Sequence, residues 1–222
     1  MGGIADARVR LGITRGLAAA ATDQAFDFLS KLAANADESY AIRAAAIEAL
    51  GRRGAAANLP IIIDALKSDS QNDQVRVAAL HALGDMNLKE GLDAAIPYCK
   101  PGVLSRTRPV AIETVGRLGH HDMEKAYDAV WMYLTEREDR ARGAAVAALV
   151  EIKDKRGLEV IDHAAALTRD PDFRERLGEA RGQLAAAANL DKSVEGANAE
   201  IDRLKRELDQ LKQKIKQDED RH

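Results

Sequence analysis

One arginine recurs along most of the chain at an almost constant interval, and this repeat constrains the fold more than any other feature. Small and aliphatic residues follow it at helical spacing, as in residues 42–51 and 75–84. The successive intervals are 33, 33, 32, 34 and 32 residues. A fixed period of this length is typical of chains built from stacked copies of one small unit. The sequence therefore predicts six units, whose arginines are Arg10, Arg43, Arg76, Arg108, Arg142 and Arg174.

Each unit is predicted to contain two helices, because a second apolar segment of helical period separates successive arginine-led segments. Glycines that close three arginine-led segments are expected to end helices in the left-handed conformation, and aspartates just ahead of three such segments are expected to cap helix N-termini. These residues are Gly51, Gly84 and Gly116, and Asp73, Asp139 and Asp172. Pro60 and Pro109 lie near predicted helix starts, whereas Pro97 lies inside its segment and predicts a kink or an early end.

Residues 42–51, 75–84 and 141–152 resemble HEAT-like repeats of the phycobilisome-lyase type, whose pattern also runs Val-Arg-x-x-Ala-Ala-x-x-Ala-Leu-Gly. The resemblance covers roughly residues 5–188. It implies an all-α fold, an α-solenoid or superhelix of about six two-helix repeats, and little about chemistry, since such repeats occur in scaffolds, lyase subunits and appended domains. The order of the chain is also similar to the C-terminal HEAT-repeat region of bacterial aminopeptidase N family proteins, where a short charged helical tail can follow.

The composition changes near residue 191, so we expect a solenoid over residues 1–190 and a charged, heptad-patterned helical tail over residues 191–222. Charged residues flank the apolar heptad positions, and three pairs have opposite charges at the spacing that joins the helices of a parallel coiled coil. These pairs are Glu200 with Lys205, Glu207 with Lys212, and Lys214 with Glu219. The tail therefore predicts a parallel homodimer through Ile201, Leu204, Leu208, Leu211 and Ile215.

The alternative for the tail is a long amphipathic helix that serves as the second helix of the sixth repeat. It would cover the exposed end of the solenoid, as repeat proteins require. In that case the side chains that pack onto residues 173–187 are Val194, Ala197, Ile201 and Leu204.

Charge and composition limit the classes of partner and the compartment. With 33 basic and 36 acidic residues the formal charge is -3, which gives no field that attracts a polyanion, so nucleic acid is not an expected partner. The single cysteine, Cys99, has no partner for an internal disulfide, which fits the cytoplasm. The sequence shows neither a targeting signal nor an apolar run of about 18 residues, so we expect no membrane contact.

No catalytic, cofactor or metal site is expected. His120 and His121 precede Asp122 in a predicted turn without a second cluster of ligands, so we interpret them as a solvated turn. His81 and His163 are expected to pack or to form hydrogen bonds beside the core. Cys99, next to Lys100, is interpreted as a packing residue; the alternatives are a thiol of lowered pKa and, as the lyase resemblance implies, a pigment contact. Because no His-Glu-x-x-His motif is present, the aminopeptidase resemblance implies a zinc site outside this segment.

The segment 123–136 is apolar around much of a helical circumference, which predicts an interface. The expected core stripe comprises Tyr127, Val130, Trp131 and Leu134, and the expected partner-contact residues are Tyr98, Met132 and Tyr133. The recurring arginines are expected to pair with acidic residues and tie repeats together rather than to bind phosphate.

The sequence thus predicts a non-catalytic protein–protein interaction scaffold that uses the curved face formed by the second helices. The alternatives are the C-terminal accessory domain of a zinc aminopeptidase with an upstream catalytic domain, and a bilin lyase-like subunit.

Overall fold

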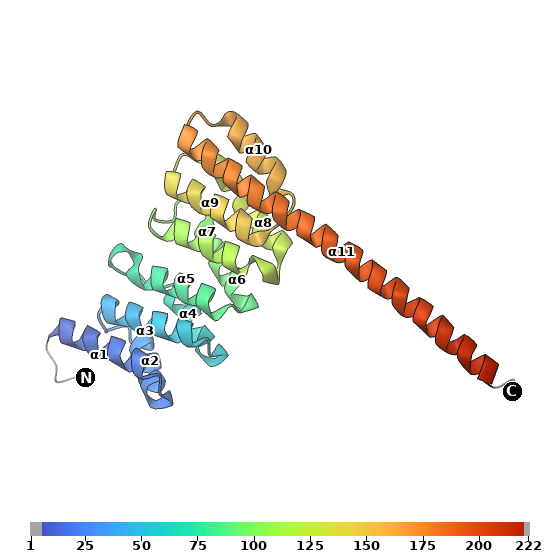
Figure 1. The fold of residues 1–222 in the computed structure, drawn as a ribbon. Helices are drawn as coiled ribbons and strands as arrows, with labels where there is room; N and C mark the ends of the chain where they lie inside the picture. Colours follow the sequence, from blue (N-terminus) through green and yellow to red (C-terminus); the bar gives the residue numbers. More distant parts are fainter. Residues whose placement is uncertain (1–5, 220–222) are drawn as a thin grey trace.

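The computed structural model describes the backbone of residues 6–219 and the side chains of residues 6–190 and 192–208. Over these residues all regular structure is helical, and helix pairs stack in the order of the sequence (Figure 1). The first helices of the pairs are α1 (Ala7–Ala20), α3 (Tyr40–Arg53), α5 (Gln74–Met86), α7 (Thr107–Leu118) and α9 (Asp139–Ile152). The second helices are α2 (Asp23–Ala34), α4 (Leu59–Ala65), α6 (Lys89–Ala95), α8 (Met123–Val130) and α10 (Gly157–Leu167). One long helix, α11 (Pro171–Glu219), follows, and the predicted all-α solenoid is confirmed.

Small residues bring neighbouring first helices into close contact. A Cβ atom added to Gly51 of α3 would lie 2.4 Å from the Cα of Ala82 in α5, and one added to Gly116 of α7 would lie 2.6 Å from the Cα of Ala148 in α9. The expectation that these glycines end helices is wrong, because both lie inside their helices. The helix that contains Gly51 ends instead at Gly54, which has a φ of 70°. Gly84 is also inside its helix, α5.

The predicted aspartate caps are not formed either. The side chain of Asp73 precedes α5 but does not cap it, because Arg76 and Thr107 donate to its carboxylate. Asp139 is the first residue of α9, and the side chain of the residue at its N-cap makes no capping hydrogen bond. At the start of α11 the carboxylate of Asp170 accepts a hydrogen bond from the backbone N–H of Asp172. Asp170 therefore caps this helix, and Asp172 does not.

The prolines act as expected. Helix α6 ends at Ala95 and continues as a 3-10 turn, Ile96–Cys99, in which Pro97 occupies the first turn. Pro60 lies in the first turn of α4, where its missing N–H costs no hydrogen bond. Pro97 thus accompanies the early end of α6, but the third repeat is not alone in having a short second helix, since α4 also has seven residues.

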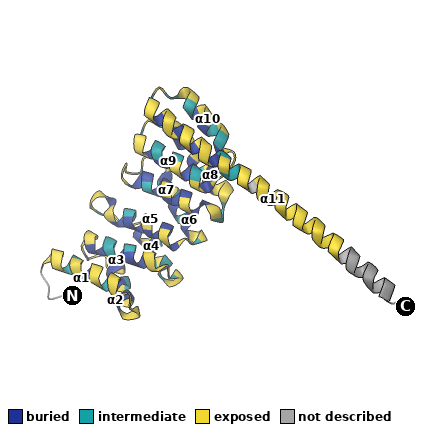
Figure 2. Cartoon of the chain, in the orientation of Figure 1, coloured by how far each residue is buried: buried dark blue, intermediate teal, exposed yellow. Residues whose placement is uncertain are grey.

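Helix α11 is packed against the solenoid only in its first part. Its side chains Phe173, Leu177, Ala180 and Leu184 are buried, whereas every described side chain from Asn189 to Leu208 is exposed (Figure 2). The alternative in which the tail folds back as the second helix of the sixth repeat is wrong, because α11 continues without a break and the sixth repeat is this one helix. The predicted boundary at residue 190 falls within α11, where burial ends, and the tail extends about 45 Å further at 1.5 Å per residue.

Candidate protein-interaction surfaces

The six recurring arginines, which we call the arginine ladder (Arg10, Arg43, Arg76, Arg108, Arg142 and Arg174), lie near the starts of the first helices and of α11. Several donate from Nε to a backbone carbonyl at the end of the preceding second helix. The distances are 3.3 Å from Arg43 to Ala33, 2.7 Å from Arg76 to Leu66, and 2.8 Å from Arg108 to Cys99. Carbonyls at a helix C-terminus lack partners within the helix and carry partial negative charge, so a guanidinium is a suitable cap.

Three members of the arginine ladder also reach forward to an acidic residue of the next repeat. Arg10 pairs with Glu38, Arg142 pairs with Asp170 at 3.4 Å, and Arg108 pairs with Glu136 and, at 3.3 Å, with Glu138. The hydrogen bond to Glu136 raises the pKa of Arg108, although burial acts in the opposite direction. One side chain therefore contacts both the preceding and the following repeat.

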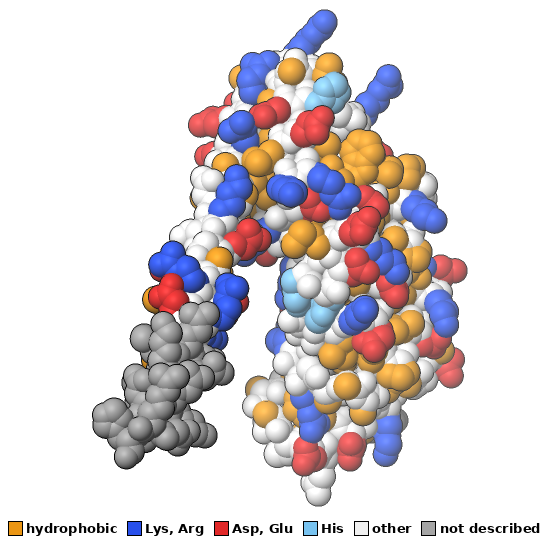
Figure 3. Space-filling model, turned by 90° about the vertical axis from the view of Figure 1, so that its right-hand side faces the viewer, with side chains coloured by type: hydrophobic (Ala, Val, Ile, Leu, Met, Phe, Trp, Pro, Cys, Tyr) orange, Lys and Arg blue, Asp and Glu red, His pale blue; other side chains and the backbone are white. Residues whose placement is uncertain are grey.

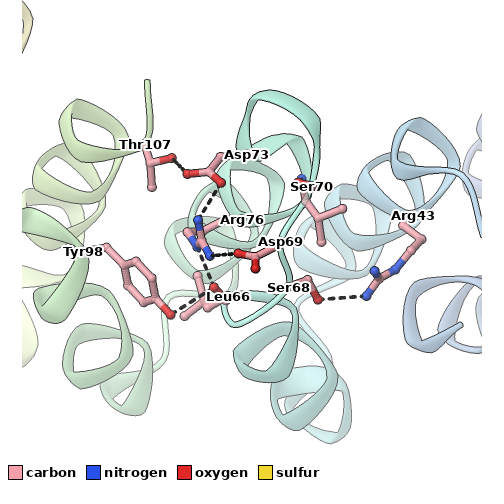
Figure 4. A network of polar contacts seen from close by, with 10 residues as sticks. Arg43, Leu66, Ser68, Asp69, Ser70, Asp73, Arg76, Tyr98 and Thr107 are labelled. Atoms are coloured by element: carbon pink, nitrogen blue, oxygen red, sulfur yellow. Dashed lines mark hydrogen bonds and ion pairs between the residues drawn. The ribbon is translucent and has the colours of Figure 1, made fainter. Parts of the chain in front are cut away.

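The middle of the arginine ladder uses a different set of partners, which Figure 4 shows. Arg43 donates to the hydroxyl of Ser68 at 3.2 Å instead of pairing with an acid. Arg76 donates to Asp73 of its own repeat at 2.6 Å, and the other oxygen of Asp73 accepts the hydroxyl of Thr107 from the next repeat at 2.6 Å. Asp73 is nearly buried and has a φ of 55°, so this short network holds its backbone in the left-handed conformation.

The last member of the arginine ladder is the least engaged. Arg174 is exposed and donates to the carbonyls of Ala165 and Thr168. The contacts of the six arginines are thus structural contacts between repeats, and their effect on stability stays a prediction.

The candidate chemical groups have ordinary structural environments. Burial raises the pKa of the Cys99 thiol to about 12, so the thiol is neutral at physiological pH. His121 lies 3.0 Å from the carbonyl of Asn87, which ends α5 in the left-handed conformation. Among the residues that the structure describes, no three His, Cys, Asp or Glu side chains are placed to hold a metal ion. His81 and His163 are exposed, so the expectation that they pack beside the core is wrong.

None of the helices in the described range is both long and apolar enough to cross a membrane.

The division of residues 123–136 into buried and exposed side chains differs from the predicted pattern. Tyr127, Val130 and Leu134 are buried as expected, but Trp131 is 41% exposed and Tyr133 only 4% exposed. The reason is a change of helix type: α8 ends at Val130, whose φ of -123° is not helical, and Trp131–Thr135 is a 3-10 helix with a different angular step. An α-helical pattern therefore assigns the wrong side chains to the core.

The three predicted partner-contact residues lie in different environments. Tyr133 lies in the core with the guanidinium of Arg108 4.6 Å from its ring centroid, so its assignment to a partner surface is corrected. Tyr98 is half-buried, and its hydroxyl donates to the carbonyl of Leu66 at 3.0 Å. Met132 is 47% exposed and remains available, and it is joined by Trp131. In Figure 3 apolar side chains reach the surface of the solenoid among charged ones.

A second apolar surface lies on the tail, which leaves the solenoid in Figures 1 and 3. Its large apolar side chains form what we call the apolar seam, and each is between 48% and 65% exposed. The apolar seam consists of Leu190, Val194, Ile201, Leu204 and Leu208. The predicted dimer residues Leu211 and Ile215 lie outside the residues whose side chains are described.

Comparison with known proteins finds a match to one family model and two solved structures with a similar fold. Residues 4–84 and 62–150 match the family model for HEAT repeats. A sequence search of curated proteins finds no match. An engineered protein of known structure is similar with a TM-score of 0.54 and 15% identity, over 83% of this chain and 94% of that chain. The complex of CpcE and CpcF of phycocyanin lyase from Nostoc sp. PCC7120 is similar with a TM-score of 0.58 and 18% identity, over 72% of this chain and 99% of that chain.

Human deoxyhypusine hydroxylase in complex with glycerol is a more distant likeness, with a TM-score of 0.47 and 17% identity over 83% of this chain and 82% of that chain. At these identities the similarities concern the fold alone.

Proposed function

Because the chain belongs to the HEAT-repeat family, whose stacked helix pairs form extended binding surfaces, we propose that it is a non-catalytic scaffold that binds another protein. The proposed contact is on the layer of second helices, at Trp131 and Met132 of the fourth repeat. This assignment keeps the predicted residue Met132 and replaces Tyr133 with Trp131.

The observation that supports the proposal is the exposure of the only tryptophan of the chain beside an exposed methionine. The same segment already supplies Tyr127, Tyr133 and Leu134 to the core, so the repeat does not need two more large side chains for its own packing. Tryptophan and methionine are enriched at protein interfaces, where tryptophan often contributes most of the binding energy.

The test compares two double variants of the full chain as bait in extracts of the source cells, with the captured proteins quantified by mass spectrometry. Trp131→Ala with Met132→Ala should lose a specific protein that the wild type captures. Val9→Ala with Leu104→Ala is the matched control, since it removes two exposed apolar side chains elsewhere and should retain that protein. The purified candidate should then shift the fluorescence emission of Trp131, which is the only indole in the chain.

Equal capture by wild type and the Trp131→Ala/Met132→Ala variant would refute this surface as the contact. Loss of capture by both double variants would also refute it, because the effect would not depend on where the apolar area was removed.

The two enzyme-linked alternatives rest on resemblance and have no residue of this chain in their favour. For a bilin lyase-like subunit the natural pigment contact is the thiol of Cys99, but that residue is 1% exposed. The accessory domain of a zinc aminopeptidase predicts that an antibody against this chain detects a native protein much larger than 24.0 kDa in the source cells.

A further inference from the structure

We propose that the tail of α11 joins two copies of this chain in a parallel, in-register coiled coil, in which each copy covers the apolar seam of the other. This inference goes beyond the proposed function and does not depend on it, because it uses residues after Asn189 and leaves the surface at Trp131 free.

The apolar seam has the spacing of a coiled coil and no cover. From Leu190 to Leu208 its members follow one another at steps of four, seven, three and four residues, which continue a single heptad frame with Ala197 in the one remaining position. Steps of three and four keep apolar side chains on one stripe of the helix that a partner helix can cover. All five large side chains are at least 48% exposed, so the described chain provides no such cover itself.

The charges beside the apolar seam fit a second copy in parallel orientation. In that arrangement Glu200 of each copy lies opposite Lys205 of the other, and the sequence places Glu207 opposite Lys212 in the same way. An antiparallel pair centred near Leu204 instead sets Glu200 of one copy against Glu207 of the other, which is unfavourable. The charge pattern therefore selects both the partner and its direction.

The solenoid leaves room for the second helix. The side chains of α11 that pack on the solenoid, such as Phe173 and Leu184, and those of the apolar seam are separated by about 100° around the helix axis, at 3.6 residues per turn. A helix that covers the apolar seam therefore approaches from the side of α11 and displaces none of its contacts with α9 and α10. The tail also leaves the solenoid in Figure 1, so both partners are free along the described apolar seam.

A parallel pair has a consequence for binding. Both solenoids emerge from the same end of the coiled coil, so the dimer carries two copies of any surface on the solenoid, related by a two-fold axis along the coiled coil. Two linked sites bind a multivalent partner more tightly than one site does, without any new contact.

The first experiment is sedimentation equilibrium of the full chain over a range of concentrations up to about 100 μM, which covers weak dimers. The wild type is expected to move from the monomer mass of 24.0 kDa toward twice that value. Ile201→Asp should weaken the dimer roughly 100-fold or more, because each dimer loses two buried isoleucines and gains two charges in the apolar seam.

Ala199→Asp is the matched control, since it adds the same residue two positions away on the opposite side of an equally exposed helix. It should leave the dimer unchanged. A wild type that stays at 24.0 kDa at every concentration would overturn the proposal, as would equal dissociation by both aspartate variants.

The second experiment tests direction and register. In a parallel, in-register pair residue 197 of one copy faces residue 197 of the other, whereas in an antiparallel pair centred near Leu204 the two are far apart along the helices. Ala197→Cys should therefore form a disulfide-linked dimer on mild oxidation only in the parallel pair. Ala199→Cys should not, and the native Cys99 does not compete because it is buried. A dimer by sedimentation that Ala197→Cys fails to cross-link would overturn the parallel arrangement.

These results are separable from the test of the proposed function. The variants in the apolar seam leave Trp131 and Met132 intact, so a monomeric chain that still captures its partner would remove this inference alone.

Discussion

Replacing Gly51 with alanine should destabilise the protein, although alanine is the better helix former. The added Cβ would lie 2.4 Å from the Cα and 2.5 Å from the Cβ of Ala82, whereas carbon atoms in contact are normally about 3.5–4.0 Å apart. Because the nearest atom belongs to the backbone of α5, no side-chain rotation relieves the contact, and α3 and α5 must separate by about 1 Å.

The magnitude follows from two opposing effects. Overpacking of a close-packed contact typically costs about 1–3 kcal/mol, and a contact with backbone belongs at the upper end of that range. Alanine in place of glycine inside a helix returns about 0.5–1 kcal/mol. We therefore expect Gly51→Ala to lower the free energy of unfolding by about 1–2 kcal/mol.

Gly12→Ala provides the control, because Gly12 also lies inside a first helix but an added Cβ would meet nothing within 4 Å. This substitution should raise the free energy of unfolding by about 0.5–1 kcal/mol. Urea denaturation followed by far-UV circular dichroism measures both, and the variants should shift the midpoint in opposite directions. Equal shifts of the same sign would refute the argument that backbone contact at Gly51 sets the spacing of α3 and α5.

Two further predictions concern buried groups. Arg108→Met should lower the free energy of unfolding by about 2–3 kcal/mol, because it leaves two partly buried carboxylates and one helix-end carbonyl without their donor. Arg174→Met, at the exposed member of the arginine ladder, should lower it by less than about 1 kcal/mol. Comparable losses for the two variants in urea denaturation would contradict the role assigned to the contacts of Arg108. Burial raises the pKa of the Cys99 thiol to about 12. The thiol should therefore stay unmodified by a thiol reagent at pH 8 in the folded protein and react after denaturation. Rapid modification of the folded chain would contradict the placement of Cys99 in the core.

Periodicity was sufficient to predict the stacked helix pairs, but it did not distinguish glycines that end a helix from glycines that let two helices approach. Gly51 occurs after an apolar run in either case, and the difference depends on Ala82, a residue of the neighbouring repeat. The two arginines between Gly51 and Gly54 were a local sign that the helix continues for another turn, because basic residues favour the last turn of a helix.

The partner surface was only partly predictable for a similar reason. The apolar content of residues 123–136 indicated a surface, and Met132 is exposed as that pattern required. The pattern assumed one α-helix, however, and the change to a 3-10 helix after Val130 exchanges the environments of Trp131 and Tyr133. Such a change depends on packing contacts between helices, including that of Arg108 in α7 with Tyr133, and leaves no mark in the spacing of apolar residues.

The contacts of the arginine ladder give a physical reason for its interval. Arg43, Arg76 and Arg108 reach the end of the preceding second helix, nine or ten residues earlier. Arg10, Arg108 and Arg142 reach an acid 28 residues later, at the start of the next repeat. A change in repeat length would break one of these contacts. The position 28 residues after Arg76 is Leu104, which offers no carboxylate, and there Asp73 pairs with Arg76 and accepts the hydroxyl of Thr107 instead.

The same junction between the third and fourth repeats differs in how its helices meet. In the pairs α3 with α5 and α7 with α9, a Cβ added to the glycine would meet the backbone of the neighbouring helix. A Cβ added to Gly84 of α5 would instead meet the end of the Arg117 side chain of α7, at 2.7 Å. Thr114 of α7 also donates across this junction to the carbonyl of Leu80 at 3.2 Å. Polar and flexible side chains therefore form this contact, and an alanine at position 84 needs only a rotation of Arg117, so it should be tolerated where an alanine at position 51 is not.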